Sequence, residues 1–286
     1  MGQGTPVLFI HGGFGGVEST LFPRASVFDG VLPREAFRSI TYDRRNSSRS
    51  GYTTRPYVLE DLASDAAALL DHLAVERAVI VGDSLGGMVA QKFALRWPER
   101  VTGLLLCETA PRIVRSRPLV RAALAGSRLL PPRVVFGLFR RRVLNPPRYA
   151  PVGPEARESQ AVREERWALY LQTLREMPQQ DLYRYSAGLL RTYAAFFGRD
   201  LSRELGRLST LPVHVLHGTA DTVVPFTAGE WLQRCIPNAR LHALEGLDHG
   251  LLYYEEARLL VRELVERMAA DAAPRKHGWS PRATGD

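Results

Sequence analysis

Ser84 lies at the centre of the pentad Gly-Asp-Ser-Leu-Gly at residues 82–86, which is a G-x-S-x-G pattern. An apolar run at residues 79–81 precedes the pentad, and a helix-forming segment follows it as far as Trp97. In this context the pattern is typical of a sharp strand-to-helix turn that exposes a nucleophilic serine. Glycine suits the two outer positions because larger side chains there would collide with each other and with neighbouring strands. We therefore interpret Ser84 as a nucleophile.

The small residues around Ser84 have an alternative explanation: they could simply allow a strand and a helix to pack closely, as small residues do in phosphate-binding loops. Such a loop needs lysine followed by serine or threonine after its last glycine. Here Met88 and Val89 follow Gly87, and the segment does not read G-x-G-x-x-G either. The nucleophile remains the favoured interpretation.

Two further blocks contain the base and the acid that a serine nucleophile needs. His249 lies in Gly-Leu-Asp-His-Gly at residues 246–250, after the last expected strand, and Asp221 ends the block His-Gly-Thr-Ala-Asp that begins at His217. Both blocks follow expected strands, at the edge of a parallel sheet where ligand sites lie. The order Ser84, Asp221, His249 along the chain is the one typical of G-x-S-x-G hydrolases.

Glu108 is the competing candidate for the acid, because it directly follows the expected strand at residues 101–106. We favour Asp221, since it stands in the commoner Gly-x-x-Asp loop.

A glycine-rich block, Gly-Gly-Phe-Gly-Gly at residues 12–16, follows the apolar run at residues 7–10. We expect it to provide an oxyanion hole through the backbone N–H of Gly13, with Phe14 as the alternative donor. Leu85, at the start of the helix after the pentad, is expected to supply the second N–H. The competing interpretation is an ordinary glycine-rich turn.

No metal or cofactor site is expected. His214 and His217 are three residues apart on an expected strand, so they face opposite sides of the sheet, and we assign them structural roles. The two cysteines, Cys107 and Cys235, do not form a C-x-x-C pair, which argues against a zinc ribbon and a disulfide framework.

Four continuous apolar runs, each bounded by turn residues, are typical of strands in a parallel sheet that is covered on both faces. Helical spacing between them, for example from Val58 to Leu73, predicts right-handed crossovers and a doubly wound, mostly parallel sheet. The pattern stops after Pro111, where arginines, prolines and aromatic residues follow without strand alternation. We therefore predict a core at residues 1–111 and 207–271, an inserted helical cap at residues 112–206 and a disordered tail at residues 272–286.

Composition excludes several functional classes. A chain of 286 residues with 45% hydrophobic residues can bury the core of one domain and carry an insertion. The net charge of +8 does not indicate nucleic-acid binding, because no segment interleaves basic and aromatic residues. The apolar run at residues 7–10 is too short for a signal peptide or a membrane span. We expect a cytoplasmic protein without a membrane or nucleic-acid partner, as a monomer or homodimer.

The letters Gly-Asp-Ser-Leu also occur in GDSL-type hydrolases, but those enzymes need an Asn-Asp block and an Asp-x-x-His block. None of the three asparagines here precedes an aspartate, and no histidine has an aspartate three residues before it. The quoted blocks instead resemble the α/β-hydrolase superfamily over residues 7–265. Residues 82–111 are similar to the elbow region of 3-oxoadipate enol-lactonase-like esterases and lactonases. The loop from Tyr42 to Gly51 is similar to a family loop, and we interpret its residues as mainly structural.

The chain departs from this superfamily at its start, because no residues are available for the usual first two antiparallel strands. We therefore expect a sheet of about six strands. The resemblance implies hydrolysis of a carboxylic ester or lactone without a cofactor: Ser84 attacks, His249 transfers the proton and Asp221 holds the imidazole. Serine at the elbow argues against haloalkane dehalogenases and epoxide hydrolases, which use an aspartate there.

The alternatives on the same triad are a C–C bond hydrolase, a perhydrolase, or a ligand receptor with slow turnover. The partner implied is a small-molecule ester or lactone, whose identity the sequence does not specify. Arginines in the predicted cap are candidates for attracting an anionic substrate, although in a chain so rich in arginine they are more typical of a solvated helix face.

Overall fold

The computed structural model describes residues 4–13, 30–47, 50–51, 53, 55–113 and 175–272, together with short pieces between residues 130 and 172. The elements are β1 (Thr5–Ile10), β2 (Phe37–Thr41), α2 (Leu59–His72), β3 (Ala78–Asp83), α3 (Leu85–Arg96), β4 (Val101–Cys107), α7 (Gln179–Phe196), β5 (Val213–Gly218), α8 (Thr227–Cys235), β6 (Arg240–Leu244) and α9 (Glu255–Ala272).

The six described strands form one sheet in the order β2-β1-β3-β4-β5-β6, and every neighbouring pair is parallel. The predicted six-stranded, doubly wound sheet is thus confirmed. The chain runs from β1 outward to β2 and then returns across β1 to β3. The strand order therefore reverses beside β1, and the carboxyl ends of β1 and β3 flank the crevice where such sheets bind ligands.

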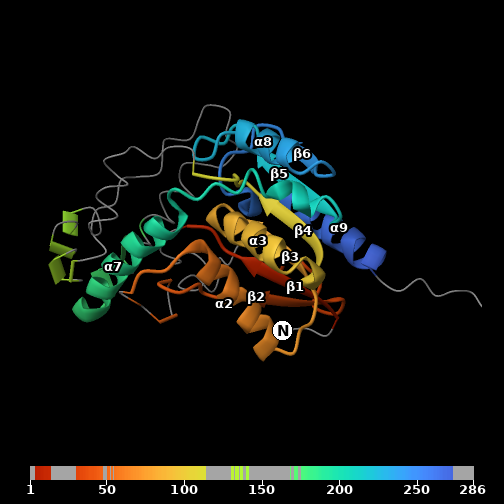
Figure 1. Cartoon of the computed structure of the whole chain (residues 1–286). Helices are drawn as coiled ribbons and strands as arrows, with labels where there is room; N and C mark the ends of the chain where they lie inside the picture. The colour runs from red at the N-terminus through yellow and green to blue at the C-terminus, as the bar shows by residue number, and fades with distance from the viewer. Residues whose placement is uncertain are drawn as a thin grey trace, which may run out of the picture.

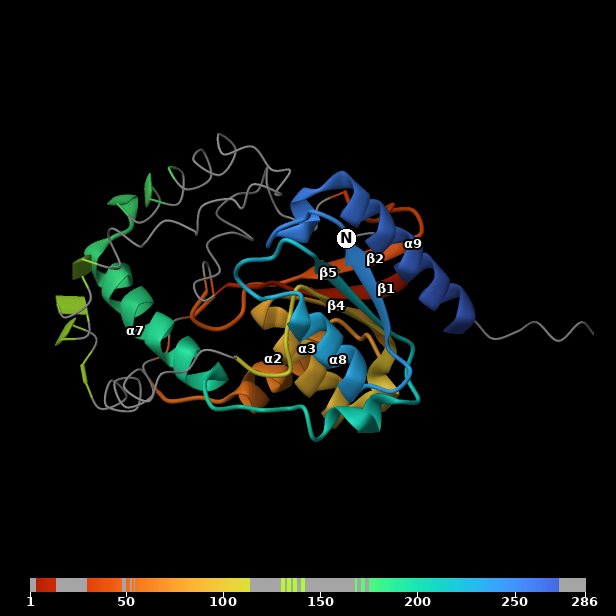
Figure 2. The same ribbon diagram turned by 90° about the horizontal axis from the view of Figure 1, so that it is seen from above.

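Helices cover both faces of the sheet, as Figures 1 and 2 show, with α2, α3 and α8 on one face and α9 on the other. Successive strand residues alternate between the two layers. Leu8 and Ile10 of β1 pack in the cluster with α2 and α3, whereas Val7 and Phe9 pack in the cluster with α9. This two-sided burial explains why the four inner strands, β1, β3, β4 and β5, are continuous apolar runs rather than alternating ones.

The two ends of the segment predicted as a cap lie side by side where they join the core. Arg112 and Asp200 form an isolated antiparallel bridge, and the backbone N–H of Leu201 donates to the carbonyl of Pro111. Within this segment α7 is helical and projects from the side of the core (Figure 1). Residues 114–129 and 142–167 lie outside the described residues.

The end of the chain differs slightly from expectation. Helix α9 continues through Ala272, so this residue, predicted to begin the disordered tail, is helical. Residues 273–286 of the predicted tail lie outside the described residues. In the described part of the chain, no helix combines the length and the apolar character needed to cross a membrane.

Candidate active site

Ser84 lies on the turn between β3 and α3, with a positive φ (φ +48°, ψ −119°) that is strained for a residue with a side chain. The turn fits only because glycines flank it. A Cβ atom on Gly86 would overlap the carbonyl oxygen of Ile10, and one on Gly82 would lie 2.6 Å from the Cβ of Ala90. The pentad thus lifts Ser84 out of the sheet at the carboxyl end of β3.

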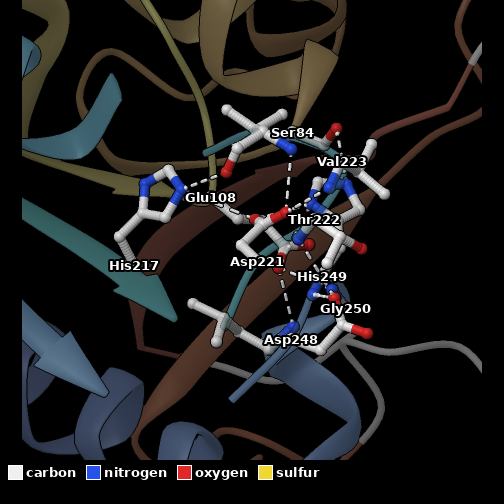
Figure 3. Close-up of polar contacts among 11 residues, drawn as sticks. Ser84, Glu108, His217, Asp221, Thr222, Val223, Asp248, His249 and Gly250 are labelled. Atoms are coloured by element: carbon white, nitrogen blue, oxygen red, sulfur yellow. Dashed lines mark hydrogen bonds and ion pairs between the residues drawn. The ribbon is translucent and has the colours of Figure 1, made fainter. Parts of the chain in front are cut away.

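Three side chains from separate loops form one line of hydrogen bonds (Figure 3). Nε2 of His249 lies 3.1 Å from Oγ of Ser84, and Nδ1 of His249 lies 2.8 Å from Oδ2 of Asp221. The carboxylate accepts a hydrogen bond from the N–H at Nδ1. In the neutral ring Nε2 then carries no hydrogen and can accept a hydrogen bond from the serine hydroxyl. The structure therefore brings the sequence-predicted serine, histidine and aspartate together, with the imidazole between the hydroxyl and the carboxylate.

Backbone and side-chain donors hold the Asp221 carboxylate. Its Oδ1 accepts from the backbone N–H groups of Val223 and Val224, each at 2.8 Å. Nε2 of His217 lies 3.5 Å from Oδ2 and 2.8 Å from the carbonyl oxygen of Val224. Burial alone would raise the pKa of Asp221, but hydrogen bonds from His217 and His249 outweigh it and hold that pKa well below its usual value. Asp221 is thus an ionised carboxylate at neutral pH.

His249 is affected by opposing electrostatic influences. Burial alone would lower the pKa of its imidazole, but the negative charges of Glu108 and Asp221 and the hydrogen bond to Asp221 outweigh this and raise it above 6.5. The backbone N–H of His249 donates to Oδ1 of Asp248 at 2.5 Å, which fixes the loop that carries the ring. The site is therefore built to stabilise the imidazolium form of His249.

Glu108, the competing acid, also reaches this region but has a different hydrogen-bond role. Its Oε2 accepts from the backbone N–H groups of Gly250 and Leu251 at 2.6 and 2.9 Å and lies 3.8 Å from Nδ1 of His249. Burial raises the pKa of the Glu108 carboxyl; the charge of His249 opposes that shift. Asp221 is therefore the hydrogen-bonded partner of the imidazole, and Glu108 anchors the loop that follows it.

Glu108, Asp221 and His249 have possible ligand atoms within 4.8 Å of one another, which is close enough for a metal ion. Hydrogen bonds already join His249 to Asp221 and both carboxylates to backbone N–H groups. A cation there would have to break the contact between the imidazole and Asp221. The cluster is thus explained by its own hydrogen bonds.

The loop expected to provide the oxyanion hole lies directly beside Ser84. A Cβ atom on Gly12 would come within 2.8 Å of the Cβ of Ser84, and Gly13 has φ +70°, a conformation that favours glycine. Leu85 is the first residue of α3, where backbone N–H groups have no partner within the helix. Gly13 and Leu85 thus lie on the two segments that meet at Ser84. Phe14, the alternative donor, lies outside the described residues.

Two side chains that sequence reasoning treated as structural contact the site. His217 does face the opposite side of the sheet from His214, as expected, but it approaches Asp221. Arg44 donates to the carbonyls of Gly12 and Gly13. The sequence did not reveal the contact of Arg44, because this residue follows β2, whose position beside β1 is visible only in the folded structure.

The chain matches known proteins over most of its length. A family model described as "alpha/beta hydrolase fold" covers residues 5–256. The chain is 30% identical to a non-heme chloroperoxidase of Streptomyces lividans over 87% of each chain, and 30% identical to a pimeloyl-[acyl-carrier protein] methyl ester esterase of Chromobacterium violaceum, over 73% of this chain and 78% of that protein.

The chain is also similar to lactonases, in sequence and in structure. A 3-oxoadipate enol-lactonase of Acinetobacter baylyi is 29% identical over 72% of this chain and 70% of the relative. The crystal structure of an enol-lactonase from Burkholderia xenovorans shares the fold, with a TM-score of 0.64 and 22% identity over 94% of this chain and 92% of that one. The predicted superfamily is confirmed, and the chain belongs to the α/β-hydrolase fold family.

Proposed function

We propose that this protein is a serine hydrolase that cleaves a small carboxylic ester or lactone through an acyl-enzyme, with Ser84, His249 and Asp221 as its catalytic triad. The observation that carries the proposal is the continuous line of contacts from Oγ of Ser84 through the imidazole of His249 to Asp221, at 3.1 and 2.8 Å. These distances are within the range needed for proton transfer from a nucleophile to its base.

In this mechanism Oγ of Ser84 attacks the substrate carbonyl while Nε2 of His249 takes the hydroxyl proton. Asp221 stabilises the imidazolium that forms. Backbone N–H groups of Leu85 and of Gly13 or Phe14 stabilise the negative oxygen of the tetrahedral intermediate. His249 then returns the proton to the leaving oxygen, and the carbon–oxygen bond of the ester breaks.

Water completes the cycle. His249 removes a proton from the water, which attacks the acyl-enzyme, and the proton returns to Oγ of Ser84 as the acid leaves. An ester gives an acid and an alcohol, whereas a lactone gives a single hydroxy acid. Relatives named as a methyl ester esterase and an enol-lactonase support this choice of bond, because each name specifies a carboxylic ester or its cyclic form.

The test is proton release in a pH-stat over short and long acyl esters and over neutral and carboxylated lactones. Wild type is compared with Ser84→Ala and with Ser209→Ala, whose serine is exposed and far along the chain from the pentad. We expect Ser84→Ala to lower kcat about a million-fold and Ser209→Ala to leave it unchanged. A Ser84→Ala protein with a tenth of wild-type turnover would overturn the mechanism.

A second candidate is perhydrolysis, which the chloroperoxidase relative favours because it is 30% identical over 87% of each chain. Hydrogen peroxide would then replace water, attack the acyl-enzyme and release a peracid, with the peroxide proton returning through His249. The peracid would oxidise bromide and revert to the acid. Bromination of a dye with peroxide and acetate, lost in Ser84→Ala, supports this activity. No bromination by an esterase-active sample excludes it.

A further inference from the structure

Arg44 is placed next to the glycine-rich loop by the pairing of the first two strands. It follows β2, which pairs in parallel with β1, so both strands end at the same edge of the sheet. The side chain is 1% exposed and is among the largest fully buried side chains of the described residues. Its guanidinium lies 5.7 Å from the ring centroid of Phe196, at the end of α7.

The guanidinium makes its hydrogen bonds through one nitrogen. Nη2 donates to the carbonyl oxygen of Gly12 at 3.0 Å and to that of Gly13 at 2.6 Å. Among the described residues, Nε and Nη1 have no hydrogen-bond acceptor. A buried cation with unused donors costs free energy that an apolar side chain of the same size would not. Packing therefore does not explain an arginine here.

The two bonded carbonyls belong to the peptide units that matter most for an oxyanion hole. In a planar trans peptide the C=O and N–H bonds point in opposite directions. The carbonyl of Gly12 shares its unit with the N–H of Gly13, and the carbonyl of Gly13 shares its unit with the N–H of Phe14. A donor that fixes the carbonyl of Gly12 on one side thereby orients the N–H of Gly13, the favoured oxyanion donor, toward the other side.

His11 reinforces the same loop. One ring nitrogen, Nδ1, lies 2.7 Å from the carbonyl oxygen of Gly12, and the other, Nε2, accepts from the backbone N–H of Arg44 at 3.2 Å. This arrangement requires the neutral imidazole with its hydrogen on Nδ1. Burial and the charge of Arg44 lower the pKa of His11 to about 3, which keeps the ring neutral. The carbonyl of Gly12 thus has two donors.

We propose that Arg44 is a positioning residue that fixes the oxyanion hole, by binding the carbonyls of the two peptide units that contain its candidate donors, the N–H groups of Gly13 and Phe14. Its charge also polarises these peptide units, which strengthens their N–H groups as donors. The inference deepens the proposed hydrolase function and rests on it. Arg44 would not touch the substrate but would act through the backbone of Gly12 and Gly13.

The test compares Arg44→Met, Arg44→Lys and Arg45→Met, using a substrate whose turnover depends on Ser84. Methionine preserves the apolar stem and removes both hydrogen bonds, and lysine keeps the charge. Arg45 is the matched control because its guanidinium binds Asp65 and lies over the ring of Tyr57 instead of the loop. Active sites are counted by the end point of labelling with a fluorophosphonate, and thermal unfolding confirms that each variant is folded.

We expect Arg44→Met to lower kcat per labelled site about ten- to a hundred-fold, less than the loss of a whole oxyanion donor, with KM nearly unchanged. Affinity for a boronic acid, which mimics the tetrahedral intermediate, should fall by the same factor as kcat/KM. Arg44→Lys should show a smaller loss, and Arg45→Met should match wild type.

A purely structural role would lower the number of labelled sites but not kcat per site. The proposal is therefore overturned if both Arg44 variants match Arg45→Met in kcat per site, or if only KM rises. If Arg44→Met fails to fold, Arg44→Lys decides by the same readouts. Turnover that persists in Ser84→Ala would overturn the hydrolase mechanism itself, and the role of Arg44 with it.

Discussion

Oε2 of Glu108 lies 3.8 Å from Nδ1 of His249, the same nitrogen that contacts Oδ2 of Asp221 at 2.8 Å. The imidazole therefore faces two buried carboxyl groups. Both raise its pKa above 6.5, against the effect of burial. Because the pKa of Glu108 is itself raised, Glu108 ionises as the pH increases, and its charge then holds the proton on the imidazole more strongly.

Glu108→Gln should move the acidic limb of kcat/KM to lower pH. A base must be neutral, so activity is lost as the pH falls through the pKa of His249, and removal of a nearby negative charge lowers that pKa. Glutamine retains an oxygen that can accept from Gly250 and Leu251. The measurement is kcat/KM of wild type and variant from acid to alkaline pH.

The control for this prediction is Glu245→Gln, which removes an exposed carboxylate from the same loop region. Its profile should coincide with that of wild type. If the Glu108→Gln profile also coincides with wild type, Glu108 exerts no charge on the imidazole and serves only to bind the backbone of the loop.

Asp221→Asn should lower kcat about ten-thousand-fold, because the amide cannot hold the tautomer with hydrogen on Nδ1 and cannot stabilise the imidazolium. Glu108→Gln, measured at its own optimal pH, should lose far less. The two variants are compared by kcat on one ester. Full activity of Asp221→Asn, together with loss in Glu108→Gln, would show that Glu108 is the acid.

The sequence was sufficient for the parts of the fold and site that depend on local pattern. Four continuous apolar runs predicted β1, β3, β4 and β5. The blocks after β3 and β5 located Ser84 and Asp221, and the block after the last expected strand, β6, located His249. Strand β2 had no such signal, because its buried residues Phe37 and Ile40 are separated by two polar ones. Tertiary pairing decides its position, since β2 hydrogen-bonds to β1 along one edge.

The supporting contacts of the site could not be predicted, because each joins residues far apart in the chain. Glu108 binds backbone groups 142 and 143 residues later, and Arg44 binds carbonyls 31 and 32 residues earlier. Only the folded geometry selects these partners from the many carboxylates and arginines of the chain. The loop from Tyr42 to Gly51 was interpreted as mainly structural, and its sequence did not distinguish the buried Arg44 from the arginine beside it.

Gly86→Ala should destabilise the fold by about 1–3 kcal/mol and lower activity as well. The added methyl would overlap the carbonyl oxygens of Ile10 and His11, which are fixed main-chain atoms at the end of β1. Relief of the clash must move the turn that carries Ser84. Urea unfolding gives the change in stability, and Gly51→Ala is the control, because no atom of the described residues lies within 4 Å of its new methyl. Equal stability of the two variants would contradict the prediction.

The contact between His214 and His242 predicts a loss of stability in acid. Nδ1 of His214 lies 2.9 Å from Nε2 of His242, so a hydrogen bond between them needs at least one neutral ring. Burial, followed by the charges of His242, Arg240 and Arg267, lowers the pKa of His214 to about 4. Between about 6.5 and 4 the unfolded chain therefore binds a proton at His214 that the folded chain does not, and the free energy of unfolding falls as pH falls through this interval.

His214→Gln removes this titration, so its free energy of unfolding should fall less than that of wild type over the same interval. Urea unfolding across a series of pH values measures the difference between the two curves. His72→Gln, at the exposed end of α2, is the control and should follow wild type. Parallel curves for wild type and His214→Gln would mean that the unfolded chain and the folded chain protonate His214 alike, and that the acid sensitivity of the fold arises elsewhere.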